Sequence, residues 1–434
     1  MLTHYLSLAL RSFRRNKALT TLMVLTIALG IGASMTTLTV FHVISGDPIP
    51  AKSDRLFYVQ MNALPDSQYD PSDADEPLQM TRIDAQTLLA EAHGKRQAMM
   101  SAGGVVITPA TSDQGAFRVE SRYTSADFFP MFDVPLRYGQ AWSAHEDADR
   151  ARVAVISSKL NRQLFGGADS VGRTIQVSGS ALRVVGVIDT WAINPRFYDL
   201  TNSEFGDSEN IFIPFSTAMD LKLSLSGSMW CWSDAPEGKT ALSAPCAWIQ
   251  YWTELGAASD AAHYRRYLDN YIARQHDLGR FRHPGDIELL DVMQWLDVNH
   301  VVPSDVRLQL WLALGFLVIC LLNTIGLLLA KFLRRSSEIG VRRALGASRA
   351  TVFAQYLVEA GIVGLTGGTL GLGLALIGLA LVRRQPADYA PMAHMDLTML
   401  LATFALALLS SLVAGALPAW RAMQVTPAVQ LKTQ

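Results

Sequence analysis

Four long apolar runs constrain this chain more than any other feature of its sequence. They lie within residues 18–45, 305–331, 351–382 and 397–417. A helix needs about 20 mainly apolar residues to cross the hydrocarbon core of a bilayer, and each run is long enough. Half of the 434 residues are apolar and 17% are charged, which is a low share for a soluble protein. The sequence therefore predicts a membrane protein with four transmembrane α-helices.

The segment between the first two runs, residues 46–304, has a different composition. It holds 22 Lys or Arg against 33 Asp or Glu, a net charge of −11, while the whole chain has −1. A basic surface of the kind that binds nucleic acid is therefore not expected on this segment. Strand-like and helix-like patterns alternate along it, which predicts a large α/β domain with two lobes. The expected strands include 56–61, 152–156, 174–177, 182–188 and 210–213, and the expected helices are 84–92, 158–165 and 261–275.

Positive charge gives the orientation of the four spans. Residues 1–17 carry four basic residues and an apolar face, and they read as an amphipathic helix at the cytoplasmic interface. Residues 331–349 carry six basic residues and one acid. Basic loops stay in the cytoplasm, so both termini and the tail, 418–434, are expected there and the α/β domain outside. A cleaved secretory signal is the rival interpretation of the N-terminus, but the first run is longer than a signal's apolar region.

The loop between the second and third spans, residues 332–350, combines apolar and basic residues at helical spacing. Ile339, Val341 and Leu345 alternate with arginines, and Gly346 is a stop signal. The pattern predicts a short basic amphipathic helix joined to both spans. It is equally typical of a membrane-surface helix that only binds anionic lipid headgroups.

Small and polar residues within the spans indicate how the helices pack. Glycine allows two membrane helices to approach closely, and Asn323 is suited to a hydrogen bond across a dimer interface. Glu359 is the one acid of the third span, and we expect it to pair with Arg342 or Arg343. Pro418 is expected to end the last span. The glycines expected at helix contacts are Gly30, Gly364, Gly368 and Gly371.

Residues 224–252 contain Cys231, Cys246 and four tryptophans. In an oxidising compartment the two cysteines are suited to a disulfide that closes a short loop; two free thiols are the alternative. The segment is interpreted as a compact insert that buries its aromatic rings, or as a contact surface. Cys320 lies in an apolar run and is interpreted as packing.

Catalytic and metal-binding motifs are missing from the sequence. The nearest approach to a phosphate-binding loop has Ser233 where its first glycine should be. The histidines are scattered, without ligands at metal-binding spacing, and no nucleophile elbow occurs. We therefore expect no catalytic residue, no metal and no cofactor bound by this chain.

Two stretches resemble known families. The run from Asn323 through Lys331 to EIGVRRALGAS, residues 338–348, resembles the signature of FtsX-like ABC transporter permeases. In the α/β segment, VAVISSKLNRQLFGG (153–167), VGRTIQV (171–177) and NIFIPF (210–215) resemble the MacB-like periplasmic core domain. Residues 418–431 resemble the family's C-terminal end. Residues 224–252 have no counterpart in that pattern.

The resemblance implies a permease subunit without catalytic activity that transmits motion from an ABC ATPase, which holds the ATP and Mg, to a periplasmic domain. It implies that the 332–350 loop docks on the ATPase. Expected partners are a separate ATPase subunit, a second permease copy or related permease, membrane lipid and, for efflux, a periplasmic adaptor and outer-membrane exit duct. The expected location is the bacterial inner membrane. Lipoprotein release and signalling to a cell-wall partner are the alternative functions. The residues assigned to ATPase coupling are Glu338, Ile339, Gly340, Arg342, Arg343, Leu345 and Gly346.

Overall fold

The computed structural model describes residues 17–65, 79–109, 115–281 and 287–424. The chain divides into two compact units. One unit combines residues 1–45 with 302–434, and the other is residues 46–301. The expected amphipathic helix at 1–17 and the end of the tail lie outside the described residues, except for Lys17 and 418–424.

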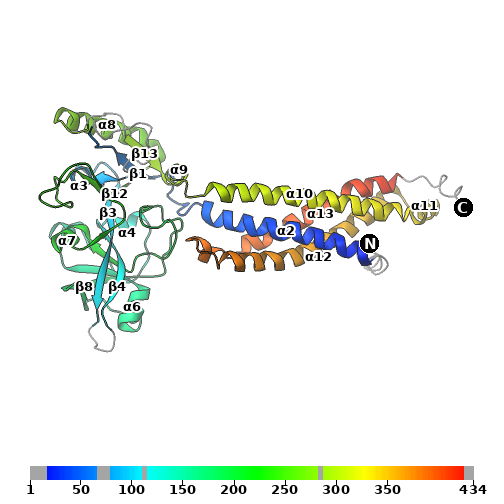
Figure 1. Cartoon of the computed structure of the whole chain (residues 1–434), viewed down its shortest axis with the longest axis horizontal. Helices are drawn as coiled ribbons and strands as arrows, with labels where there is room; N and C mark the ends of the chain where they lie inside the picture. The colour runs from blue at the N-terminus through cyan, green and yellow to red at the C-terminus, as the bar shows by residue number, and fades with distance from the viewer. Residues whose placement is uncertain (1–16, 66–78, 110–114, 282–286, 425–434) are drawn as a thin grey trace. The chain divides into compact units, whose positions relative to one another are not determined.

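The first unit is a bundle of four long helices that run side by side (Figure 1). Each is long and apolar enough to cross a membrane. They share a buried apolar cluster that includes Ile27 and Ile31, Leu328, Val363 and Ala407. The prediction of four spans with a large α/β domain after the first is confirmed. The helices are α2 (Lys17–Ser45), α10 (Ser304–Leu333), α12 (Arg349–Val382) and α13 (Leu397–Met423).

The prediction that Pro418 ends the last span is wrong. Helix α13 continues through Pro418 to Met423. Proline removes one backbone hydrogen bond from a helix, but neighbouring elements can compensate for the loss inside a membrane bundle. Pro418, Ala419 and Ala422 are all buried, so packing of this face holds the last turns in helical form.

The expected glycine contacts occur between the bundle helices. A Cβ atom on Gly364 would lie 2.2 Å from Ser411 Cβ, and one on Gly368 would lie 2.5 Å from Ala407 Cβ, both on α13. The opposite side of α12 approaches α2, because a Cβ on Gly371 would lie 3.1 Å from Ile31. These distances leave no room for a side chain, so the glycines set how closely α12 packs.

The second unit is built on one large mixed sheet. The order of its main path is β13-β1-β12-β3-β4-β9-β6-β8-β5, so the strands of both expected lobes belong to one sheet. Most neighbours are antiparallel, and β4–β9 and β6–β8 are parallel. The strands on this path are β1 (Leu56–Met61), β3 (Arg96–Thr108), β4 (Phe117–Thr124), β5 (Leu136–Gly139), β6 (Val153–Ser157), β8 (Ser180–Ile188), β9 (Ile211–Pro214), β12 (Cys246–Glu254) and β13 (Ile287–Asp291).

Short strands and helices complete this α/β domain. Its core contains residues of nearly every strand, and the helices α3 (Arg82–Glu91) and α8 (Ala261–Asp277) contribute Leu88 and Leu268 to it. The additional strands are β2 (Met80–Thr81), β7 (Thr174–Val177), β10 (Leu225–Ser226) and β11 (Trp230–Cys231). The helices are α3 (Arg82–Glu91), α4 (Phe128–Met131), α5 (Ala144–Ala148), α6 (Ser158–Phe165), α7 (Phe215–Asp220), α8 (Ala261–Asp277) and α9 (Val292–Val298).

The interpretation of residues 224–252 as an insert needs correction. Its second part is β12, which is buried along its whole length and pairs with β1 and β3 in the middle of the sheet. Trp248 and Trp252 are therefore buried within the sheet-based domain rather than in a separate subdomain. The Cys231–Cys246 disulfide is present and joins β11 to β12. The lack of polar and apolar alternation in β12 explains why its pattern did not identify it, since strands buried on both faces do not alternate.

The two ends of the α/β domain meet at one edge of its sheet. Strand β1 follows shortly after α2 in sequence, and β13 leads directly into α9, which precedes α10. The two strands pair antiparallel over five residues, from Phe57–Asp291 to Met61–Ile287. The Tyr58 ring stacks on Trp295 of α9, with centroids 3.8 Å apart. The incoming and outgoing chains are thus fastened to each other inside this domain.

Candidate functional site

The residues that link α10 to α12 form what we call the basic hairpin (residues 331–359). It contains α11, Ser336–Ala344. This helix ends because Gly346 adopts a φ of +100°, a conformation that favours glycine, and its N–H donates to the Arg343 carbonyl at 3.2 Å. Ser348 then caps α12 by accepting a hydrogen bond from the Thr351 N–H at 3.1 Å. Two local signals therefore fix where one helix stops and the next begins.

The two faces of α11 have different environments. Ile339 is 3% exposed and packs into the apolar cluster of the bundle, and Gly340 is also buried. Val341 and, just after the helix, Leu345 are 54% and 83% exposed. Residues four apart share one side of a helix, so these two side chains form a small apolar projection. We call this pair the apolar knob (Val341 and Leu345). Exposed large apolar side chains grouped in this way mark interaction sites.

The arginines of α11 are held by polar contacts within the bundle. Arg342 forms an ion pair with Glu338 at 2.6 Å, and both side chains are about 40% exposed. Such a pair contributes only about 0.3–0.5 kcal/mol. Arg342 also donates to Gln355 of α12 at 3.2 Å, and Arg343 donates to the Met423 carbonyl of α13 at 3.3 Å. These contacts orient α11 against α12 and α13 more than they stabilise the fold.

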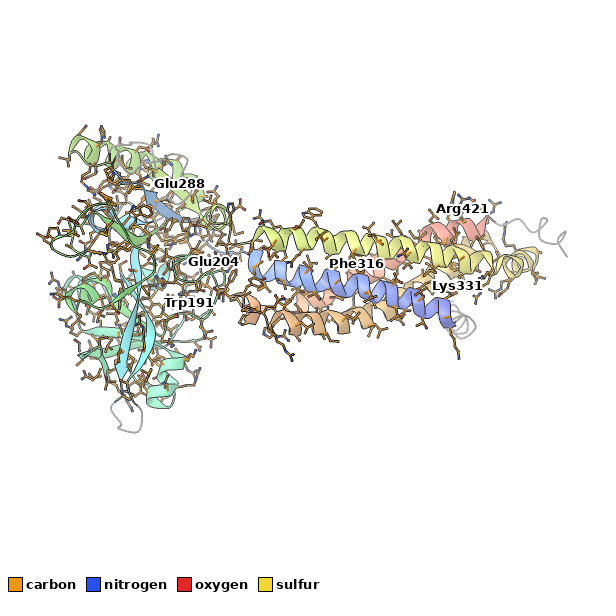
Figure 2. The ribbon with its side chains drawn as sticks, in the orientation of Figure 1. Trp191, Glu204, Glu288, Phe316, Lys331 and Arg421 are labelled. Carbon is orange, nitrogen blue, oxygen red and sulfur yellow. A yellow bond between two sulfur atoms is a disulfide. The ribbon has the colours of Figure 1, made fainter. Side chains whose placement is uncertain are left out.

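Glu359 carries an ion pair that the sequence reasoning missed. The expected partners were Arg342 or Arg343, whereas the structure pairs Glu359 with Lys331 in the last turn of α10, at 2.6 Å. The two side chains are 3% and 0% exposed. Lys331 and Arg421 lie toward the same end of the bundle (Figure 2). The available signal was a lysine at the end of one apolar run and a lone acid near the start of the next.

The other expected packing residues lie elsewhere in the bundle. Gly30 faces α10, where a Cβ atom would lie 3.0 Å from Cys320 Cβ. Asn323 is exposed on the outer side of α10, away from the other helices of the bundle. A polar side chain on the lipid-facing surface of a span is costly, so this position favours a further protein contact.

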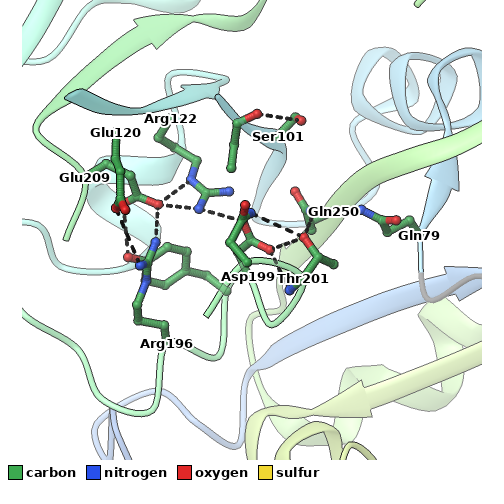
Figure 3. Close-up of polar contacts among 12 residues, drawn as sticks. Gln79, Ser101, Glu120, Arg122, Arg196, Asp199, Thr201, Glu209 and Gln250 are labelled. Atoms are coloured by element: carbon green, nitrogen blue, oxygen red, sulfur yellow. Dashed lines mark hydrogen bonds and ion pairs between the residues drawn. The ribbon is translucent and has the colours of Figure 1, made fainter. Parts of the chain in front are cut away.

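A buried polar cluster in the α/β domain was not predicted from the sequence (Figure 3). Arg122 of β4 and Arg196 both donate to Glu209, and Arg196 does so at 2.6 Å. Arg122 also pairs with Asp199 at 2.8 Å. None of these four side chains is more than 5% exposed. We call this set the arginine cluster (Arg122, Arg196, Asp199 and Glu209). It joins the long loop between β8 and β9 to the sheet.

Burial and charge act in opposite directions on this cluster. Burial, the largest influence, would raise the pKa of Glu209, but Arg122 and Arg196 together outweigh it and lower the pKa to about 2. Burial would lower the pKa of Arg122, yet the carboxylates of Glu209 and Asp199 raise it above its ordinary value. Glu209, Arg122 and Arg196 are therefore charged at neutral pH. Such networks are structural in many proteins, and nothing among the described residues places a reacting group beside them.

The loop that the arginine cluster holds also contacts helix α9 and strand β12. The indole N–H of Trp295 donates to the Phe197 carbonyl at 3.0 Å, and that of Trp252 donates to the Tyr198 carbonyl at 3.3 Å. Within the described ranges, no group of three or more His, Cys, Asp or Glu side chains is placed to hold a metal ion. These hydrogen bonds therefore hold the β8–β9 loop against the rest of the α/β domain.

Two family profiles match this chain in sequence order. The MacB-like periplasmic core domain matches residues 20–237, which is half of the chain, and the FtsX-like permease C-terminal profile matches residues 311–427. The second match contains the basic hairpin, most of α10 and all of α12 and α13.

Curated relatives agree with this assignment. The chain is 27% identical over 315 residues to the pyoverdine export ATP-binding/permease protein PvdT of Pseudomonas aeruginosa. It is 26% identical over 317 residues to the macrolide export ATP-binding/permease protein MacB of Salmonella typhi. Each alignment covers 71% of this chain and 42% of the relative, so the chain spans about two-fifths of the length of these proteins. A crystal structure of the periplasmic region of MacB from Actinobacillus actinomycetemcomitans aligns with a TM-score of 0.36 at 12% identity, covering 56% of this chain and 92% of that one.

Proposed function

The chain belongs to the family of ABC transporter permeases that have a MacB-like periplasmic core domain and an FtsX-like C-terminal region, and from this premise we propose that it transmits the ATP-driven motion of an ABC ATPase to its α/β domain and so drives export of a periplasmic substrate. It would act in the inner membrane of a bacterium, with the α/β domain in the periplasm. ATP and Mg would be held by the ATPase.

The observation that carries this proposal is the apolar knob on the basic hairpin. Val341 and Leu345 are exposed, whereas Ile339 on the other face of the same segment is buried. Arg334 and Arg349, in the same basic hairpin, are also exposed. Exposed apolar side chains together with arginines are typical of a protein docking surface.

The long helices favour transmission of motion along the bundle. Helix α10 has 30 residues and α12 has 34. At about 1.5 Å per residue they are about 45 and 51 Å long, against about 30 Å for the hydrocarbon core. Each is one uninterrupted helix, so movement at the hairpin is passed along it instead of being lost at a break. Such coupling requires that ATP favour one of two arrangements of these helices.

We expect Leu345→Asp to release the ATPase. Burying a carboxylate in place of a leucine at a docking centre should cost about 2 kcal/mol or more of binding free energy, about a thirtyfold loss of affinity. The measurement is capture of the ATPase from native membranes by the tagged, detergent-solubilised protein. Leu278→Asp is the matched control, because Leu278 is 74% exposed but lies at the end of α8 in the α/β domain.

The outcomes of this capture experiment separate the candidate functions. Equal recovery of the ATPase with Leu345→Asp and Leu278→Asp would show that the apolar knob is not part of the coupling site. A periplasmic adaptor in the captured material supports export, while a lipoprotein carrier would favour lipoprotein release. Recovery of no ATPase with the unchanged chain would overturn the proposed function.

We propose that a second permease copy packs on the outer face of α10 that contains Asn323. In a chain whose Cys320 is replaced by alanine, Asn323→Cys should form a disulfide-linked dimer on mild oxidation of native membranes. Leu401→Cys on α13 is the control, since Leu401 is 62% exposed in the same bundle. We expect several-fold more cross-linked dimer from Asn323→Cys. Equal cross-linking from both positions would contradict this interface.

A further inference from the structure

The pair formed by Lys331 and Glu359 connects the two helices on either side of α11. Lys331 lies in the last turn of α10, and Glu359 lies in the third turn of α12. Their 2.6 Å contact therefore closes the basic hairpin at its base. No motif or family match assigns a role to either residue.

Aromatic and apolar side chains pack around the pair, and Arg335 is close enough to Lys331 to act on it electrostatically. The Phe332 and Tyr356 rings lie beside it, with centroids 4.1 Å apart. Phe332, Tyr356 and Ala360 all belong to the buried cluster of the bundle, together with Ile339 of α11. The charges are thus enclosed by the same side chains that hold α11 in place.

A buried ion pair of this kind is a poor means of stabilising a fold. Desolvation of the two charges largely cancels their attraction, and replacing such pairs by apolar residues is often neutral or stabilising. What the pair does provide is a preference for one alignment, because the two charges meet at 2.6 Å in the present register of α10 and α12. A shift of one helical turn, about 5.4 Å, would separate them and lose this attraction.

We propose that Lys331 and Glu359 are positioning residues that fix the register of α10 against α12, so that movement of α11 reaches α10 instead of being absorbed by sliding within the hairpin. This inference rests on the proposed function for its purpose, but the register itself is a property of the chain alone. An experiment can therefore overturn the proposed function and leave the register standing, or the reverse.

The first test measures the register by disulfide trapping in membranes. Phe332→Cys is combined in turn with Tyr356→Cys, Val352→Cys and Ala360→Cys, in a chain whose Cys320 is replaced by alanine. The last two positions lie four residues, about one turn, on either side of the first. With the ion pair intact, cross-linking should be confined to the Tyr356→Cys combination.

The variant that decides the question replaces both charges by apolar residues of similar size, Lys331→Met with Glu359→Leu. This pair should remain folded, since it leaves no lone charge. We expect cross-linking to spread to the Val352→Cys and Ala360→Cys combinations, each to at least a third of the Tyr356→Cys yield. The exchanged pair, Lys331→Glu with Glu359→Lys, should again confine cross-linking to the Tyr356→Cys combination. If cross-linking in the apolar variant stays confined to the Tyr356→Cys combination, as in the unchanged chain, the proposal is wrong.

The second test asks whether register serves coupling. ATP added to the complex with the ATPase should change tryptophan emission of the α/β domain in the unchanged chain and in the exchanged pair. The apolar pair should bind the ATPase equally but lose most of that response. An undiminished response would overturn the coupling role. Failure of the unchanged chain to capture any ATPase would instead refute the proposed function, and the cross-linking pattern would still decide the register.

Discussion

Glu209→Gln is expected to destabilise the α/β domain by about 3–5 kcal/mol. The substitution keeps the shape of the side chain but removes the carboxylate on which Arg122 and Arg196 converge. Arg122 retains Asp199, but the cluster is left with one buried guanidinium charge too many. Urea unfolding of the detergent-solubilised chain, followed by tryptophan emission, measures the change in unfolding free energy. Seven of the nine tryptophans report on this domain, namely Trp142, Trp191, Trp230, Trp232, Trp248, Trp252 and Trp295.

Glu120→Gln is the matched control for this variant. Glu120 approaches the same arginine, Arg196, at 4.0 Å, but its side chain is 72% exposed. An exposed pair contributes at most about 1 kcal/mol, so the control should lie close to the unchanged protein. If both variants lose the same stability, the arginine cluster does not brace the domain as described.

The effect of Glu209→Gln should also depend on pH. The folded-state pKa of Glu209 is lowered to about 2 from an ordinary 4.5. Its contribution is therefore complete above about pH 4.5 and is lost as the pH falls towards 2. The difference between the unchanged chain and Glu209→Gln should shrink across that window. A difference that stays constant from pH 7 to pH 3 would contradict the assignment of the effect to this carboxylate.

Removing the Cys231–Cys246 disulfide should have the second largest effect. The bond closes a sequence separation of 15 residues and joins β11 to the central strand β12. Loss of a cross-link of this span is expected to cost about 3 kcal/mol. Comparison of urea midpoints with and without reductant measures it. The response should be absent from the Cys231→Ser, Cys246→Ser double variant, since the remaining cysteine, Cys320, is unpaired.

Thiol alkylation gives an independent test of the same bond. In folded protein without reductant, an alkylating reagent should modify neither Cys231 nor Cys246. Modification of both would refute the disulfide. Cys320 is buried in the bundle and should react only after denaturation.

The sequence predicted the bundle well because its signals are local. Apolar length places each span, and Gly346 and Ser348 mark the ends of neighbouring helices through their own backbone and side-chain preferences. Pro418 was misread because a helix buried against its neighbours tolerates a residue that would end it in water. The family resemblance supplied the remaining order of the domains.

The features that escaped sequence reasoning depend on contacts between distant residues. Strand β12 is buried on both faces, so its pattern resembles an aromatic insert and not an alternating strand. Arg122 and Glu209 are 87 positions apart, and each alone resembles a solvated surface charge. Lys331 was visible at the end of one apolar run and Glu359 near the start of the next, but their pairing depends on how α10 and α12 pack.

The antiparallel pairing of β1 with β13 has a mechanical consequence. The chain enters and leaves the α/β domain through two strands that are hydrogen-bonded together and clamped by the Tyr58–Trp295 stack. Movements of α2 and α10 in opposite directions would have to break the hydrogen bonds between β1 and β13. A shared movement of both helices would leave these bonds intact. Under the proposed function, this joint would resist differential motion of the two helices and transmit their common motion.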